Sequence, residues 1–97
     1  MNLNYIEKQL TRYQSTLKAY EDISRYAMEK AESIQSHTEE LMNQKDDASL
    51  EKCITLLSDA LAYKDIVLEL GERQKKLSKE FLVFKERARK DLDRMKK

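Results

Sequence analysis

The 97-residue sequence contains no proline and no tryptophan, and it has only one glycine and one cysteine. Turn-rich folds, strand-rich folds and phosphate-binding loops draw on glycine and proline, so this composition excludes them and favours helices. The single Cys53 cannot form an internal disulfide, which is typical of a reducing compartment. No apolar run exceeds four residues, far below the roughly 20 that a membrane-spanning helix needs.

An excess of one sign of charge is also missing, because 19 Lys+Arg oppose 18 Asp+Glu and leave a formal net charge of +1. Total charge therefore indicates no particular class of partner. The first residues, Met1 to Tyr5, hold neither the basic region nor the apolar stretch of a secretory signal peptide. Together with the lone cysteine, this start favours a cytoplasmic protein.

Apolar or small side chains recur at alternating steps of three and four residues in the first half of the chain, which is the spacing of a heptad seam. This seam predicts a helix over residues 3–43, capped by Asn2 or Asn4. The polar stretch 43–47 then favours a turn. The seam positions of this helix are Leu3, Ile6, Leu10, Tyr13, Leu17, Tyr20, Ser24, Ala27, Ala31, Ile34, Thr38 and Leu41.

A second seam follows the turn and predicts a helix over residues 48–96, with Asp46 or Asp47 as its cap. Gly71 lowers the helix propensity at one point and marks a possible kink, but we expect one continuous helix. The seam positions here are Cys53, Leu56, Ala60, Tyr63, Val67, Leu70, Gln74, Leu77, Phe81, Phe84, Ala88 and Met95, with Asp91 as the one charged member.

Two such helices predict an all-α fold, a long antiparallel helical hairpin resembling a coiled coil, with residues 1–97 in a single domain. Seam positions whose numbers sum to about 90 then face each other, for example Ile6 and Phe84, or Tyr13 and Leu77. Because two helices bury little surface, dimerisation into a four-helix bundle is the expected way to complete the core.

A second apolar row flanks the seam in the first half of the second helix. Its members are Leu50, Ile54, Leu57, Leu61 and Leu68. One partner helix cannot cover both rows, so we expect this row to bind a protein. Two occupants stay open: a second copy, giving a homodimer, or an amphipathic helix of another protein. The predicted function is a non-enzymatic protein-protein interaction module, namely an adaptor, small chaperone or inhibitor.

Charge is unevenly placed, since residues 1–18 and 72–97 together carry +8 while residues 19–71 carry −7. Ion pairing along the helix and the helix dipole offer a structural reason for the basic end. Its candidate docking residues are Lys85, Arg87, Arg89, Lys90 and Arg94. The alternative function is a structural or membrane-surface coiled-coil rod that docks to anionic lipid through this end. Nucleic-acid binding is not expected, because the nearby aromatic residues belong to the seam.

Residues suited to catalysis or metal binding are few. His37 and Glu40 are three apart on one helix face and offer two metal ligands, but the sequence has no second histidine. Cys53 lies on the seam, where a thiol packs as a small apolar side chain. We therefore expect no enzyme activity, no cofactor and no metal site.

Overall fold

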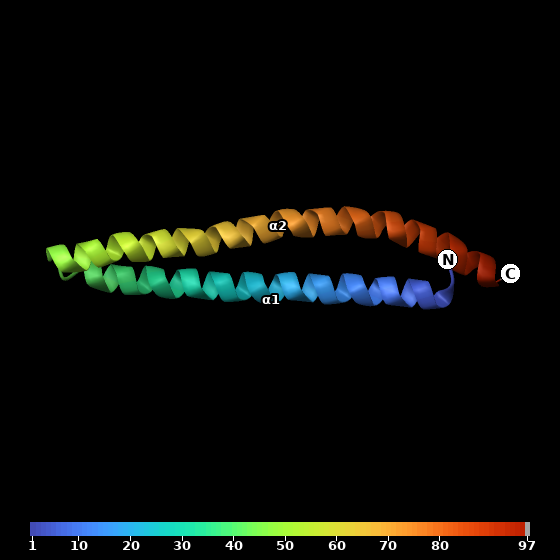
Figure 1. Ribbon diagram of the computed structural model, residues 1–97, viewed down its shortest axis with the longest axis horizontal. Coiled ribbons are helices and arrows are strands. Elements are labelled where there is room, and N and C mark those ends of the chain that lie inside the picture. The colour runs from blue at the N-terminus through green and yellow to red at the C-terminus, as the bar shows by residue number, and fades with distance from the viewer. Residues whose placement is uncertain (97) are drawn as a thin grey trace. The chain divides into compact units, whose positions relative to one another are not determined.

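The computed structural model describes residues 1–96, which are helical apart from the first two residues and one short turn. Helix α1 spans Leu3–Met42 and helix α2 spans Asp47–Lys96, without a break at Gly71. Figure 1 shows that the chain reverses direction between α1 and α2. The all-α prediction is confirmed.

Both helices begin at a side chain that accepts a backbone hydrogen bond. The Tyr5 backbone N–H donates to Asn2 Oδ1 at 2.7 Å, so Asn2 caps α1 and Asn4 does not. The Ser49 backbone N–H donates to Asp46 Oδ1, also at 2.7 Å, so Asp46 caps α2. These bonds satisfy amide groups that have no carbonyl partner within the helix, and thereby fix the first turn of each helix.

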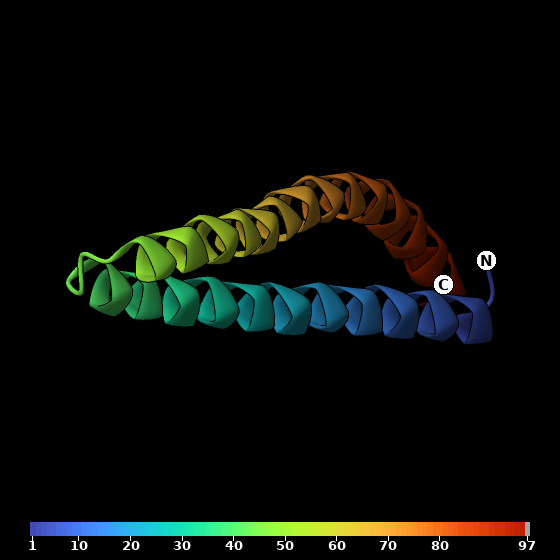
Figure 2. The ribbon, with the colours of Figure 1, turned by 60° about the vertical axis from the view of Figure 1, so that its left-hand side comes forward.

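Figure 2 shows the short turn that connects the two helices. One residue of this turn has the left-handed backbone conformation that usually favours glycine. Lys45 has a φ of 57°, and its N–H donates to the carbonyl of Met42 at 3.3 Å. The Gln44 N–H donates to the carbonyl of Leu41 at 3.1 Å. The last carbonyl groups of α1 are thus satisfied before the chain reaches the cap of α2.

The chain divides into two compact units. That residues 1–97 form a single domain stays a prediction. The turn unit is Asp22–Leu70, and the terminal unit combines Met1–Glu21 with Gly71–Lys97. In each unit a segment of α1 pairs with a segment of α2, which makes the turn unit a helical hairpin.

Most of the buried seam positions in the turn unit carry small side chains, with Leu41 and Leu70 as the larger exceptions. Ala27, Ala31 and Ala60 are buried, and Ala31 has no exposed surface at all. The buried Cys53 thiol donates to the carbonyl oxygen of Thr38 across the helix pair, at 3.6 Å. Because small side chains let two helices approach closely, they bury themselves fully while covering little else.

The seam of the terminal unit is aromatic. Ile6, Phe84 and Ala88 form a buried cluster, as the predicted pairing of Ile6 with Phe84 requires. The Tyr13 ring centroid lies 5.2 Å from that of Phe81 and 5.6 Å from that of Phe84. Tyr13 therefore packs about one helical turn further along α2 than the predicted pairing with Leu77. Helical side chains lean toward the N-terminus of their own helix, which shifts antiparallel contacts in this direction.

Several predicted seam positions lie at the surface instead. Leu3 and Met95 are exposed because they stand near the helix ends. Leu10 and Leu17 are exposed as well, on one flank of the aromatic residues Tyr13 and Phe81. The exposed Gln74 also contributes nothing to the core. The partly buried Leu92, which has no place in the heptad spacing, packs against the aromatic cluster.

Candidate functional site

The predicted leucine row lies on the surface of α2 within the turn unit. Its five side chains, the leucine face, are between 41% and 70% exposed: Leu50, Ile54, Leu57, Leu61 and Leu68. Because successive helical residues turn by about 100°, this face lies roughly a third of the way round α2 from the seam. The side chains of α2 that contact α1 therefore belong to the seam and not to the leucine face.

The small seam explains why the leucine face is left open. Cys53 and Ala60, each three or four residues from Leu57, occupy the contact with α1. Side chains of this size hold the helices together without extending sideways over the flank of α2. The partly buried Lys64 stands between Leu61 and Leu68, where its aliphatic chain continues the apolar row.

Acidic side chains border the leucine face. Asp47 and Glu51 lie seven and three residues before Ile54, and Asp65 lies four residues after Leu61. All three are exposed, so their carboxylates surround an apolar strip. Within the turn unit, 5 Lys+Arg oppose 11 Asp+Glu, a net charge of −6.

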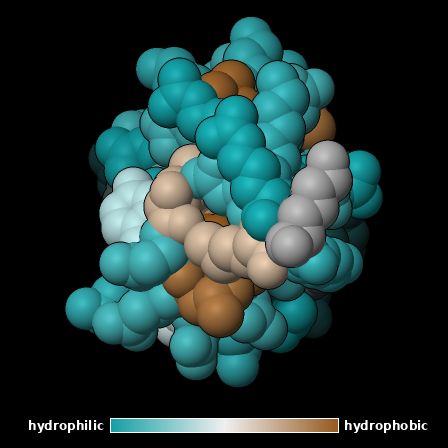
Figure 3. All heavy atoms as spheres, turned by 90° about the vertical axis from the view of Figure 1, so that its right-hand side faces the viewer, coloured by the Kyte–Doolittle hydropathy of each residue, from teal (hydrophilic) through white to brown (hydrophobic). Residues whose placement is uncertain are grey.

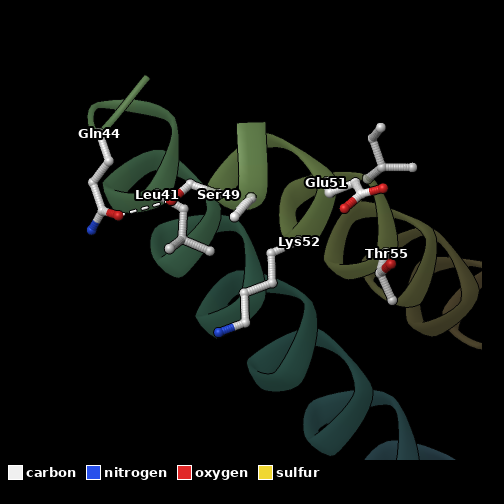
Figure 4. Close-up of a pocket in the computed structure, with 8 residues that line it drawn as sticks. Leu41, Gln44, Ser49, Glu51, Lys52 and Thr55 are labelled. Atoms are coloured by element: carbon white, nitrogen blue, oxygen red, sulfur yellow. Dashed lines mark hydrogen bonds between the residues drawn. The ribbon is translucent and has the colours of Figure 1, made fainter. Parts of the chain in front are cut away.

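A hollow of about 690 Å³ adjoins the leucine face near the turn (Figure 4). Its wall includes Ile54 and the polar side chains of Gln44 and Ser49. The Ser49 hydroxyl lies 2.8 Å from Gln44 Oε1 and 2.9 Å from Asp46 Oδ2. The backbone N–H of Ser49, and then its hydroxyl, lower the pKa of Asp46 below its ordinary value of 3.8. The hollow therefore lies beside the capped turn and has a mixed lining of polar side chains and of Leu41, Ala48 and Ile54.

A second apolar surface lies in the terminal unit, and we name it the terminal groove. It is a hollow of about 590 Å³ whose principal apolar lining is Leu10, Tyr13, Leu17, Leu77, Phe81 and Leu82. The rings of Tyr13 and Phe81 form its aromatic part, and Leu82 is 58% exposed at its edge. A smaller hollow of about 400 Å³ on the other flank of the cluster includes Val83 and the Arg12 guanidinium, which lies over the Tyr13 ring.

The terminal groove was missed in the sequence, although a signal for it exists. Residues 81–84 form an apolar run of four, and a heptad seam uses only the first and last of them. Leu82 and Val83 must then emerge on the two flanks of the seam, where each one lines a hollow. A second apolar surface follows from this surplus, as it does for the leucine row.

The predicted basic docking residues are all exposed, but they do not form one strip. They are Lys85, Arg87, Arg89, Lys90 and Arg94. At about 100° per residue they spread over more than half of the circumference of α2. The end of the terminal unit that carries both chain ends is largely hydrophilic (Figure 3). In this unit 14 Lys+Arg oppose 7 Asp+Glu, a net charge of +7.

One ion pair closes the terminal unit. The Met1 ammonium donates to Asp91 Oδ2 at 2.7 Å, and the Asp91 side chain is 22% exposed. This hydrogen bond, helped by the positive charges of the ammonium and of Arg94, lowers the pKa of Asp91. Arg94 Nη1 lies 3.8 Å from the other Asp91 oxygen. Asp91 is thus a structural anion within a basic surface.

Over residues 1–96, no three His, Cys, Asp or Glu side chains are grouped so as to hold a metal ion. His37 is exposed on α1. Neither helix, as far as it is described, combines the length and the apolarity that crossing a membrane requires. Comparison with protein-family models, with curated proteins and with solved structures gives no match for this chain.

Proposed function

We propose that this protein is a non-enzymatic, cytoplasmic interaction module that binds a helical protein surface through its leucine face. It would act as an adaptor, a small chaperone or an inhibitor. The observation that carries the proposal is a row of five exposed aliphatic side chains at heptad spacing on α2. Such a row matches the apolar stripe of another helix, because both repeat every three and four residues.

The energetics favour a long partner over a short peptide. Each side chain of the leucine face is about half exposed, so covering it contributes about 1 kcal/mol. The five together contribute about 5 kcal/mol, while association itself costs at least about 4 kcal/mol. A partner must therefore engage the whole face, and gain further contacts beside it, to form a stable complex.

Site-specific photo-crosslinking tests the proposal. A photoreactive amino acid replaces Leu57, which is 41% exposed on the leucine face, or Ile66, which is 40% exposed. Ile66 lies nine residues along α2, half a turn round the helix, and is the matched control. We expect the probe at position 57 to capture a second polypeptide and the probe at position 66 to capture far less.

A second experiment places charged side chains on the leucine face and measures crosslinking from a probe at position 50. The double substitution Leu57→Lys and Leu61→Lys should abolish the crosslink formed from Leu50, whereas Ile66→Lys should leave it intact. Circular dichroism verifies that each variant retains its helices. Equal capture from both probes, or unchanged capture in the double variant, would show that the leucine face is no binding site.

The exposed basic side chains motivate a second candidate, a structural rod that docks to anionic lipid. In that case the protein binds vesicles containing phosphatidylserine, and binding is lost at high salt or after Arg87, Arg89 and Lys90 are changed to glutamine. The spread of these residues around α2 favours the protein-binding proposal instead, because a flat membrane contacts one side of a helix. Vesicle binding by the wild type would promote the second candidate.

A further inference from the structure

The two units present apolar surfaces with opposite surroundings. The leucine face belongs to a unit with a net charge of −6, and the terminal groove belongs to a unit with a net charge of +7. The leucine face is a row of exposed aliphatic side chains, whereas the terminal groove is a hollow lined mainly by leucine side chains and two aromatic rings. The surroundings of the two surfaces are therefore complementary in charge.

The charges that matter lie next to the apolar residues. Leu82, at the edge of the terminal groove, has exposed basic residues three and seven positions away in both directions along α2. These are Lys75, Lys79, Lys85 and Arg89, with Glu86 as an acidic neighbour. On the leucine face the neighbours at the same spacings are Asp47, Glu51 and Asp65, with Lys64 and Lys75 as basic ones. Contact between the two surfaces would place carboxylates beside ammonium and guanidinium groups.

We propose that the partner of the leucine face is a second copy of this chain, and that the face of one copy packs into the terminal groove of the other. This inference rests on the proposed function and names the partner of the same surface. Every copy carries both surfaces, so a symmetric dimer of this kind contains the contact twice. Each contact then contains four helices, two from each copy, and covers the side chains that a single chain leaves exposed.

Contact between two leucine faces is the competing arrangement, and charge disfavours it. Two units of −6 would meet across that interface, so added NaCl would strengthen such a dimer by screening the repulsion. In the proposed dimer a unit of −6 meets one of +7, and added NaCl weakens it. The sign of the salt effect on the wild-type protein separates the two arrangements without any substitution.

Sedimentation velocity and equilibrium on the full chain provide the test. We expect a concentration-dependent dimer whose Kd rises as NaCl is raised from about 0.05 M to about 0.5 M. The face variant, Leu57→Lys with Leu61→Lys, and the groove variant, Leu10→Glu with Leu82→Glu, should each raise this Kd by about 100-fold. Ile66→Lys and Val83→Glu are the matched controls, with nearly the same exposure but outside the two surfaces, and should stay within about threefold of the wild type.

Mixing the two defective variants is the decisive arm. The face variant keeps an intact groove and the groove variant keeps an intact face, so the mixture should recover one of the two contacts as a mixed dimer. Leu82→Gln serves in place of the groove variant if circular dichroism shows that the latter loses its helices. It should weaken the dimer in the same direction.

Three results would overturn the inference. They are a wild type that stays monomeric, a groove variant that dimerises like the wild type, and a mixture that fails to associate. In each of these cases a crosslink from position 57 to another polypeptide would still support the proposed function. A face variant that dimerises normally, together with an absent crosslink, would remove both proposals.

Discussion

The two units use the same helix pair in opposite ways. In the turn unit the buried side chains between the helices are mostly alanine, cysteine and threonine, together with Leu41 and Leu70. The terminal unit is held by Tyr13, Phe81 and Phe84, whose rings contact one another but leave a hollow on each flank. In the first unit the unused apolar surface is therefore a projecting row of side chains, and in the second it is a groove. The size of the seam residues determines which of the two forms a pair of helices presents.

Phe84→Ala should cause the largest loss of stability, because it removes the centre of the aromatic seam. Phe84 is buried against Ile6 and Ala88, so its truncation leaves a cavity and should lower the free energy of unfolding by about 3 kcal/mol. Urea denaturation followed by circular dichroism measures this change. Val83→Ala, at an exposed neighbour, should cost less than about 0.5 kcal/mol. Equal losses for the two variants would mean that the aromatic cluster does not hold the terminal unit.

Ala31→Leu should also lower the stability, because it adds volume to a closely packed contact, whereas Phe84→Ala removes volume. Ala31 has no exposed surface, so three added carbon atoms must push the helices apart, and we expect a loss of about 2 kcal/mol. The same urea experiment on Ala62→Leu, at an exposed position of the same unit, provides the control and should show little change. A neutral Ala31→Leu would show that the turn unit is less tightly packed than its burial indicates.

Gly71→Ala should stabilise the protein where the two units meet in the sequence of α2. A Cβ atom built at Gly71 has nothing within 4 Å, and the residue lies within a continuous helix. Alanine should therefore raise the free energy of unfolding by about 0.5–1 kcal/mol, through its helix propensity alone. Thermal denaturation measures the gain. A loss of stability would mean that this position needs the conformational freedom of glycine.

Asp46→Asn should have the smallest effect and should show it only in acid. The pKa of Asp46 is lowered in the folded state, so its carboxylate stabilises the turn unit above the ordinary pKa of 3.8. This contribution is lost as the pH falls through the lowered value. Asparagine keeps a capping oxygen but does not titrate, so melting temperatures measured from neutral pH down to below 3.8 should fall less steeply in the variant. Parallel curves would assign the acid sensitivity to other carboxylates, with Asp91 in the terminal unit as the first to replace.

Much of the fold could be predicted because heptad spacing is a local property of the sequence. Ala27, Ala31, Thr38 and Cys53 all occupy the contact that the spacing assigned to them. The turn was equally readable, because Asp46 is a capping residue placed between two apolar patterns. These features depend on neighbours within one or two helical turns.

The apolar run at residues 81–84 indicates a second apolar surface, but heptad spacing could not predict that this surface is hollow. Spacing assigned Leu10 and Leu17 to the core, and it takes no account of how much room the rings beside them occupy. The position of Tyr13 depends likewise on the direction in which its side chain leans across to Phe81 and Phe84. The volume that side chains fill between two antiparallel helices, and the direction in which each side chain leans, depend on both helices together. A spacing pattern along one helix does not contain this information.

The order of the two units along the chain has a consequence for how the protein folds. The turn unit is continuous in sequence, so its contacts close short loops and form at little entropic cost. The terminal unit joins segments separated by the 49 residues of the turn unit, and its contacts become inexpensive only when that hairpin already holds them near each other. We therefore expect folding to start at the turn capped by Asp46, and the pairing of the two helices to extend from there toward the chain termini. During synthesis, the apolar surfaces of Ile6 and Tyr13 would then stay uncovered until Phe84 has left the ribosome.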